Sequence, residues 1–171
     1  MSDESSDSAK TADRLKIITA SIPPISDAVY EKAKTSLVLM PEDWTVPDLI
    51  FANSTESVLK VLKQGGAAVA LPDSTASVDL RDNRSDDWVS PTILVTQLML
   101  SQNPLAVSVA TNLISSYVFE FFKGRKADPQ VKLRILRETD PNRTFELVEY
   151  SGPASGLSEL PQTIDKLNKG R

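Results

Sequence analysis

The sequence of 171 residues contains neither histidine nor cysteine. Without cysteine the chain can form no disulfide and offers no thiolate to a metal. Without histidine it lacks the commonest general base and the commonest ligand of transition metals. These two absences exclude most zinc chemistry and most hydrolase mechanisms. Carboxylates with Mg²⁺, or a serine activated by lysine, remain as sources of catalysis, and each of them requires a recognisable motif.

The sequence offers no convincing motif of either kind. Ser36 lies outside any Ser-x-x-Lys pattern and no Gly-x-Ser-x-Gly elbow occurs, so neither of these motifs supports nucleophilic catalysis. The acidic cluster within residues 79–87 lacks the turn glycine and the closing glutamate of a calcium loop, and its own arginines can neutralise it. We therefore expect a protein that is not an enzyme and that holds no cofactor and no metal.

Composition and charge indicate a folded, mildly acidic protein. Hydrophobic residues make up 40% and charged residues 25% of the chain, which is ordinary for a globular domain. The net charge of −4 argues against a surface that binds nucleic acid as a whole, because phosphate neutralisation needs clustered cations. Residues 1–13 form a polar, acidic stretch, which we expect to be a disordered tail. They do not resemble an export signal, so we expect a cytoplasmic protein.

The N-terminal half predicts a small α/β unit. Ser26 is a plausible cap for a helix, and residues 37–40 fit either its end or a strand. The apolar run 49–52 predicts a buried strand. A helix is expected to follow it, with Asn53 or Ser54 as its cap and with Glu56, three residues after Asn53, completing a capping box. Residues 67–71 predict a second strand. These three segments form an expected strand, helix, strand unit with parallel pairing.

The C-terminal half predicts helices, a hairpin and a closing helix. An apolar helix is expected to begin at Ser90 and Pro91 and to end at Asn103 and Pro104, followed by a longer one over residues 105–123. Alternation over 131–135 and 145–148 predicts a β-hairpin, residues 151–156 a linker, and 157–167 an amphipathic helix. The fold class expected is α+β, with one compact domain over 14–171 and sub-halves of about 14–88 and 89–171.

Two groups of residues are candidates for binding. Open α/β sheets bind ligands at the carboxyl ends of their strands, where the expected unit places Asn53, Ser54, Asp73 and Ser74. Caps and turns are the competing interpretation, since these residue types commonly fill such positions. The second group is the basic run Lys123, Arg125 and Lys126, which follows the long helix and could meet an acidic partner.

The long helix over residues 105–122 carries one charge, Glu120. A membrane segment normally needs about 20 predominantly apolar residues. Because hydroxyl-bearing residues recur along this helix, we interpret it as a core helix and keep membrane contact as the weaker alternative. The leading hypothesis is a non-catalytic accessory protein that binds another protein through its C-terminal half, and the oligomeric state stays open. The alternatives are a small-ligand sensor using the strand ends near Asn53 and Asp73, and a peripheral membrane protein.

Overall fold

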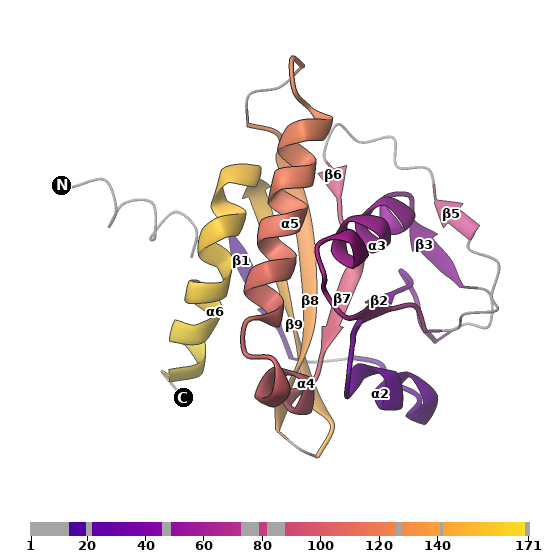
Figure 1. Ribbon diagram of the computed structural model, residues 1–171. Helices are drawn as coiled ribbons and strands as arrows, with labels where there is room; N and C mark the ends of the chain where they lie inside the picture. The colour runs from indigo at the N-terminus through magenta and orange to yellow at the C-terminus, as the bar shows by residue number, and fades with distance from the viewer. Residues whose placement is uncertain are drawn as a thin grey trace.

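The computed structural model describes residues 14–19, 22–45, 49–72, 79–81, 88–125, 128–140 and 142–169. It confirms the α+β class (Figure 1). The strands are β1 (Leu15–Ile18), β2 (Leu37–Met40), β3 (Ile50–Ala52), β4 (Val69–Ala70), β5 (Asp79–Arg81), β6 (Trp88–Val89), β7 (Thr92–Val95), β8 (Gln130–Asp140) and β9 (Thr144–Pro153). The helices are α2 (Asp27–Ala33), α3 (Thr55–Gln64), α4 (Gln97–Gln102), α5 (Ala106–Phe121), the 3₁₀ helix η1 (Ala154–Glu159) and α6 (Leu160–Lys169).

The main sheet is built around the long hairpin of β8 and β9. Its strand order is β1-β9-β8-β7-β2-β4, with β6 also paired to β8. The β2–β4, β6–β8 and β7–β8 pairs are parallel, and the other pairs of this sheet are antiparallel. Side chains alternate along β8, so Leu133 and Ile135 point to one face of the sheet and Arg134 and Leu136 point to the other. The expected hairpin is thereby confirmed.

Three helices, α3, α5 and α6, cover one face of the sheet (Figure 1). Every fourth residue along one side of α5 packs against this face and is buried, namely Ala106, Ala110, Ile114 and Val118. The small alanines at the start of the stripe let the helix approach the strands closely. This layer contains the larger of the two clusters of buried hydrophobic residues, and it confirms that the long helix is a core helix.

Helix α2 packs against part of the opposite face. Ser26 caps it by accepting a hydrogen bond from the Val29 amide, as the sequence predicted. Further along this face Arg134 lies 2.8 Å from Glu149, and Lys132 lies 3.6 Å from the same carboxylate. These ion pairs join the neighbouring strands β8 and β9 of the hairpin.

Two expectations about local structure are wrong. Residues 92–95 form β7 rather than the start of a helix, and the helix α4 begins only at Gln97. All four residues of β7 are buried, and a short continuous apolar run of this kind fits a buried strand as well as a helix. The expected linker 151–156 instead continues β9 to Pro153 and then forms η1.

The expected strand, helix, strand unit also pairs differently. β3 does not pair with β4; it pairs in parallel with β5 in a separate two-stranded sheet. β4 pairs in parallel with β2, whose four residues are all buried, so the parallel connection runs from β2 to β4. The N-cap of α3 is Ser54, whose side chain makes no capping hydrogen bond, so Asn53 does not occupy the cap position that the expected capping box with Glu56 requires. The acidic tail, residues 1–13, lies outside the described residues.

Candidate functional site

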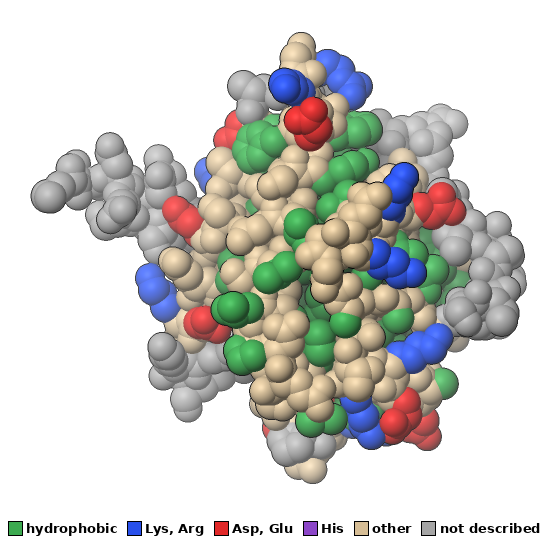
Figure 2. All heavy atoms as spheres, in the orientation of Figure 1, with side chains coloured by type: hydrophobic (Ala, Val, Ile, Leu, Met, Phe, Trp, Pro, Cys, Tyr) green, Lys and Arg blue, Asp and Glu red, His purple; other side chains and the backbone are tan. Residues whose placement is uncertain are grey.

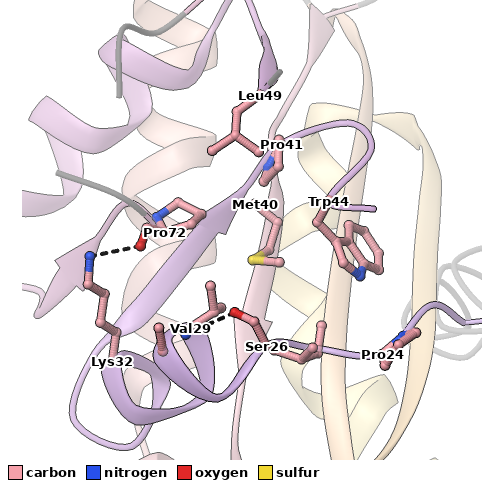
Figure 3. A pocket seen from close by; sticks show the side chains of 11 residues that line it. Pro24, Ser26, Val29, Lys32, Met40, Pro41, Trp44, Leu49 and Pro72 are labelled. Carbon is pink, nitrogen blue, oxygen red and sulfur yellow. Dashed lines mark hydrogen bonds between the residues drawn. The ribbon is translucent and has the colours of Figure 1, made fainter. Parts of the chain in front are cut away.

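A cavity of about 650 Å³ lies where the parallel strands β2 and β4 end (Figure 3). Ligands of open α/β sheets bind at this edge, outside the carboxyl ends of parallel strands. Its volume falls within the range of about 300 to 1,000 Å³ that small-molecule sites occupy. The walls are mostly apolar and come from α2, the end of β2 and the segments beside them: Pro24, Ile25, Ser26, Ala28, Val29, Lys32, Met40, Pro41, Trp44, Leu49 and Pro72.

Lys32 is the cationic group of this cavity. It projects from α2, and its Nζ donates hydrogen bonds to the carbonyl oxygens of Leu71 at 3.1 Å and Pro72 at 2.8 Å. Trp44 lies on the opposite side with Met40 between them, and its Nε1 donates to the carbonyl of Pro23 at 3.3 Å (Figure 3). These bonds to main-chain oxygens fix the two side chains that give the cavity its chemical character.

The cavity combines an ammonium group with an apolar interior. Lys32 forms no ion pair with any residue of the described segments, so its positive charge is not neutralised there by a carboxylate. An ammonium has three donors, and the two carbonyls use two of them. The arrangement therefore suits a small apolar molecule that carries an anionic group. Within the described residues, no three acidic side chains come together as a metal site.

The residues that the sequence proposed for a ligand site lie elsewhere or outside the described segments. Asn53 is exposed at the end of β3, and Ser54 is buried with its Oγ donating to the carbonyl of Val89. Asp73 and Ser74 fall outside the described residues. Lys32 and Trp44 were not singled out from the sequence, because no motif connects a helical lysine with a tryptophan 12 residues later.

A Ser-x-x-Lys spacing does occur once, at Ser57 and Lys60 in α3. Lys60 is exposed and Ser57 half-buried, and neither side chain makes a hydrogen bond or ion pair within the described part of the chain. A serine nucleophile needs its base within hydrogen-bond reach. This pair therefore gives no geometric support for catalysis.

The outward side of α5 carries no charged residue from the start of the helix to Phe119. From residue 88 to residue 119 the chain contains no Asp, Glu, Lys or Arg. Leu105 at its start is 66% exposed, and the outward positions that follow one another along the helix are Val109, Asn112, Ser116 and Phe119, all exposed. Figure 2 shows this side of the molecule, with hydrophobic and uncharged atoms over α5 and charged side chains toward the margins and over α3.

The basic run after α5 is partly engaged with the helix itself. Arg125 Nη2 donates to the carbonyl of Phe121 at 2.7 Å, and its guanidinium lies 5.0 Å from the ring centre of Phe121 and 5.8 Å from that of Phe122. Lys123 is exposed and forms no ion pair with a described residue, while Lys126 lies outside the described segments. Of the three proposed cations, Lys123 is thus the one that the described structure leaves open to a partner.

None of the helices in the described part of the chain is long and apolar enough to span a bilayer. Comparisons with known protein families, curated proteins and solved structures found no match for this chain. The function has to be inferred from the cavity and the surfaces themselves.

Proposed function

We propose that this chain is a non-catalytic interaction protein of the cytoplasm. Its binding surface is the outward side of α5 from Leu105 to Phe119, and this surface binds a second copy of the chain. The observation that carries the proposal is the exposed, uncharged row Leu105, Val109, Asn112, Ser116 and Phe119. Interface cores are depleted of charged residues in comparison with ordinary protein surface. An outward helix face in a monomer normally carries charged residues.

The spacing of this row supports pairing with another helix. Its members are separated by four, three, four and three residues. This alternation is the period by which one helix presents a continuous seam to another. A second helix with the same spacing can therefore meet the row along about 21 Å of its length, at 1.5 Å per residue.

The row is also self-complementary when two copies run antiparallel. Asn112 stands at its centre, with Leu105 seven residues before it and Phe119 seven residues after it. A twofold axis through Asn112 brings Leu105 of one copy to Phe119 of the other and the two Asn112 amides together. Such isologous contacts are the commonest way in which protein chains pair. No residue of the row is charged, so pairing brings no like charges together in the seam.

The absence of cysteine allows a direct test. The variant Asn112→Cys introduces the sole thiol of the chain at the proposed axis. A disulfide requires Cα atoms within about 7 Å, so mild oxidation should link two copies on a non-reducing gel. In Ser116→Cys the antiparallel arrangement separates the two thiols by about eight residues of helix, or about 12 Å along it, and no link should form. Light scattering after gel filtration should give the mass of a dimer for the unmodified chain.

A third variant and its outcomes complete the test. Val109→Glu places like charges in the seam, and it should convert the dimer to a monomer while circular dichroism stays unchanged. Linking of both cysteine variants would indicate a parallel pair and overturn the antiparallel arrangement. A monomeric mass for the unmodified chain, with no linking of Asn112→Cys, would overturn the proposed partner.

A small-ligand sensor is the second candidate function, and the cavity of Figure 3 favours it. The Lys32 ammonium lies in an apolar cavity and forms no ion pair with a described residue, so we expect the cavity to bind an aromatic carboxylate, for which 2-naphthoate is a suitable probe. Amide resonances of Val29 and Trp44 should shift on titration, and Lys32→Met should weaken binding because it keeps the apolar stem and removes the charge. Lys63→Met, at the exposed end of α3, is the matched control. Equal binding by Lys32→Met would remove this candidate.

A further inference from the structure

Strand β1 forms one edge of the main sheet (Figure 1). It pairs with β9 on one side, and no described strand pairs with it on the other side. An open edge presents main-chain N–H and C=O groups that can pair with a strand from another chain. The outer side of β1 is therefore a place where a partner can extend the sheet.

The register with β9 determines which main-chain groups of β1 face the open side. The Ser151 amide donates to the carbonyl of Arg14 at 3.1 Å, so these two residues form a hydrogen-bonded pair of the antiparallel ladder. Such pairs alternate with pairs that do not exchange hydrogen bonds. Leu15 and Ile17 therefore direct their N–H and C=O groups away from β9. These four groups have no hydrogen-bond partner among the described residues.

A row of alternating charges ends at this edge. Arg134 of β8, Glu149 of β9 and Lys16 of β1 lie directly opposite one another across the three strands. They point away from the helices, because the residues beside them along β8 and β9 are buried in the helix-covered cluster. Glu149 already binds Arg134 and Lys132, so two cations share its one charge. Lys16 is exposed and forms no ion pair with a described residue, so an acidic residue on an added strand would continue the row.

The other two positions of the open edge favour apolar neighbours. Leu15 packs against the helix-covered cluster, and Ile17, two residues further along the strand, points to the same face. Both side chains are only half-buried. Apolar side chains of an added strand would lie beside them on this face and complete their burial.

We infer that the open edge of β1 binds an extended acidic segment of a partner protein, which adds to the sheet as an antiparallel strand. The segment carries apolar residues opposite Leu15 and Ile17 and an Asp or Glu between them, opposite Lys16. Main-chain hydrogen bonds supply the affinity of such a contact, and the alternating side chains supply its specificity. Antiparallel pairing is slightly the more stable kind per residue.

Strand β9 shows that β1 accepts this pattern of residues. On its inner side β1 already pairs with the sequence Val148, Glu149 and Tyr150, and Glu149 lies opposite Lys16. A strand has equivalent main-chain groups on its two sides, and the same side chains of β1 face both neighbours on each surface of the sheet. A segment that alternates apolar and acidic residues is thus complementary to the open side as well.

A second copy of β1 is a poor occupant of the same edge. Lysine on an edge strand commonly guards against pairing between identical edges. The antiparallel register that joins the four open groups of two copies to each other places Lys16 directly opposite Lys16 of the second copy. Like charges directly opposite each other destabilise a strand pair, whereas an acidic residue attracts the lysine. Lys16 therefore excludes one occupant and selects the other, and this edge is separate from the α5 row proposed for a second copy.

The probe is the peptide Ser-Thr-Val-Glu-Val-Thr-Ser with both ends blocked. We expect the amide resonances of Leu15 and Ile17 to shift in a saturable way, whereas those of β4, the opposite edge strand, stay in place. Methylation of both valine nitrogens removes the donors that pair with Leu15 and Ile17, and it should abolish binding. A peptide with lysine in place of glutamate should bind about fivefold more weakly, because attraction becomes repulsion of similar size.

A charge exchange tests the role of Lys16. Lys16→Glu should reverse the preference, so that the lysine peptide binds about fivefold more tightly than the glutamate peptide. Lys60→Glu, at an exposed position of α3, makes the same change of charge elsewhere and should keep the original preference. Circular dichroism establishes that both variants are folded. The reversal cannot result from general damage to the fold, which would weaken binding of both peptides.

Three results would contradict the inference. The first is the absence of a saturable shift at Leu15 and Ile17, and the second is undiminished binding of the N-methylated peptide. The third is a folded Lys16→Glu variant that still prefers the glutamate peptide.

Discussion

The contact between Gly156 and Tyr150 provides a strong test of the packing. Tyr150 is fully buried on β9, and its hydroxyl donates to the carbonyl of Pro153 at 2.7 Å. A Cβ atom added at Gly156 would lie 2.0 Å from the Tyr150 hydroxyl oxygen and 3.0 Å from Cζ. The backbone of Gly156 is outside the left-handed region, so any cost of Gly156→Ala comes from this overlap and not from the conformation.

The expected cost follows from two opposing effects. Forcing an extra methyl into a packed interior costs about 1 to 3 kcal/mol. Replacing glycine where alanine is conformationally acceptable returns about 0.4 to 1 kcal/mol through the unfolded state. The difference between these two effects spans about 0 to 2.6 kcal/mol, and because the overlap with the Tyr150 hydroxyl is severe, we expect a net loss in the free energy of unfolding of about 1 to 2 kcal/mol. For a chain of this length each kcal/mol lowers the melting temperature by about 2 to 4 °C, so Gly156→Ala should melt about 2 to 8 °C lower.

Tyr150→Phe removes the atom that causes the overlap. Alone it should cost about 1 kcal/mol, because the carbonyl of Pro153 loses its buried donor. In the double variant the new methyl group no longer meets a hydroxyl, so the combined cost should be smaller than the sum of the single costs. We expect a coupling of about 1 kcal/mol, measured by urea denaturation of the four proteins in the cycle.

Gly66 provides the control for this cycle. It has φ of 85° and no atom within 4 Å of an added Cβ, so Gly66→Ala is costly through its backbone alone. Its cost should be the same in the presence and absence of Tyr150→Phe. Simple additivity of Gly156→Ala and Tyr150→Phe would refute the proposed packing of η1 on Tyr150.

Three further predictions concern single polar side chains. Thr96→Val should lower the free energy of unfolding by about 1 to 2 kcal/mol, measured by urea denaturation, because the buried hydroxyl caps α4 and donates to the carbonyl of Ala33. Burial opposes ionisation of Glu149, but Arg134 and Lys132 outweigh it and lower its pKa. Glu149→Gln should therefore be less stable than the unmodified chain at pH 7, and this difference should disappear as the pH falls through the lowered pKa; a difference that persists in acid would contradict the ion pair. The hydrogen bond to Glu138, followed by burial, raises the pKa of Tyr30 to about 12. The hydrogen bond of neutral Tyr30 therefore contributes its full stability below the ordinary tyrosine pKa near 10, and this contribution is lost as the pH rises toward 12. Tyr30→Phe should abolish this loss, as measured by denaturation at alkaline pH.

Periodicity alone predicted the parts of the fold that have two unlike faces. The alternation of β8 and β9 and the apolar stripe of α5 are visible in the sequence because one side of each element is buried and the other is not. The fully buried β7 has no such contrast, so Ile93 and Leu94 were assigned to a helix that begins only at Gln97. Gly152 and Gly156 suggested a linker, whereas both lie beside the Tyr150 hydroxyl, and at Gly156 a side chain would overlap it.

The sequence located its candidate ligand site by a strand pairing that the structure does not show. The rule that ligands bind at the ends of parallel strands pointed to Asn53 and Asp73 because β3 and β4 were expected to pair. β3 pairs in parallel with β5 instead, and β4 pairs in parallel with β2; the carboxyl ends of β2 and β4 are followed by Pro41 and by Leu71 and Pro72. Strand pairing depends on long-range contacts that a local pattern does not contain, so residue identities at the site could not be derived without the fold.

The two sides of α5 need separate explanations, and this distinction favours a partner for the outer one. Burial of Ala106, Ala110, Ile114 and Val118 explains the inner side within a single chain. It does not explain why the outer side carries no charge as far as Phe119, since Lys or Glu at Asn112 or Ser116 would fit a helix facing water and improve solubility. A membrane would explain an apolar outer face, but the amide and hydroxyl of these two residues would then lie in lipid without partners. A second protein helix accommodates both properties, because it covers Leu105 and Phe119 and offers polar partners at the centre of the seam.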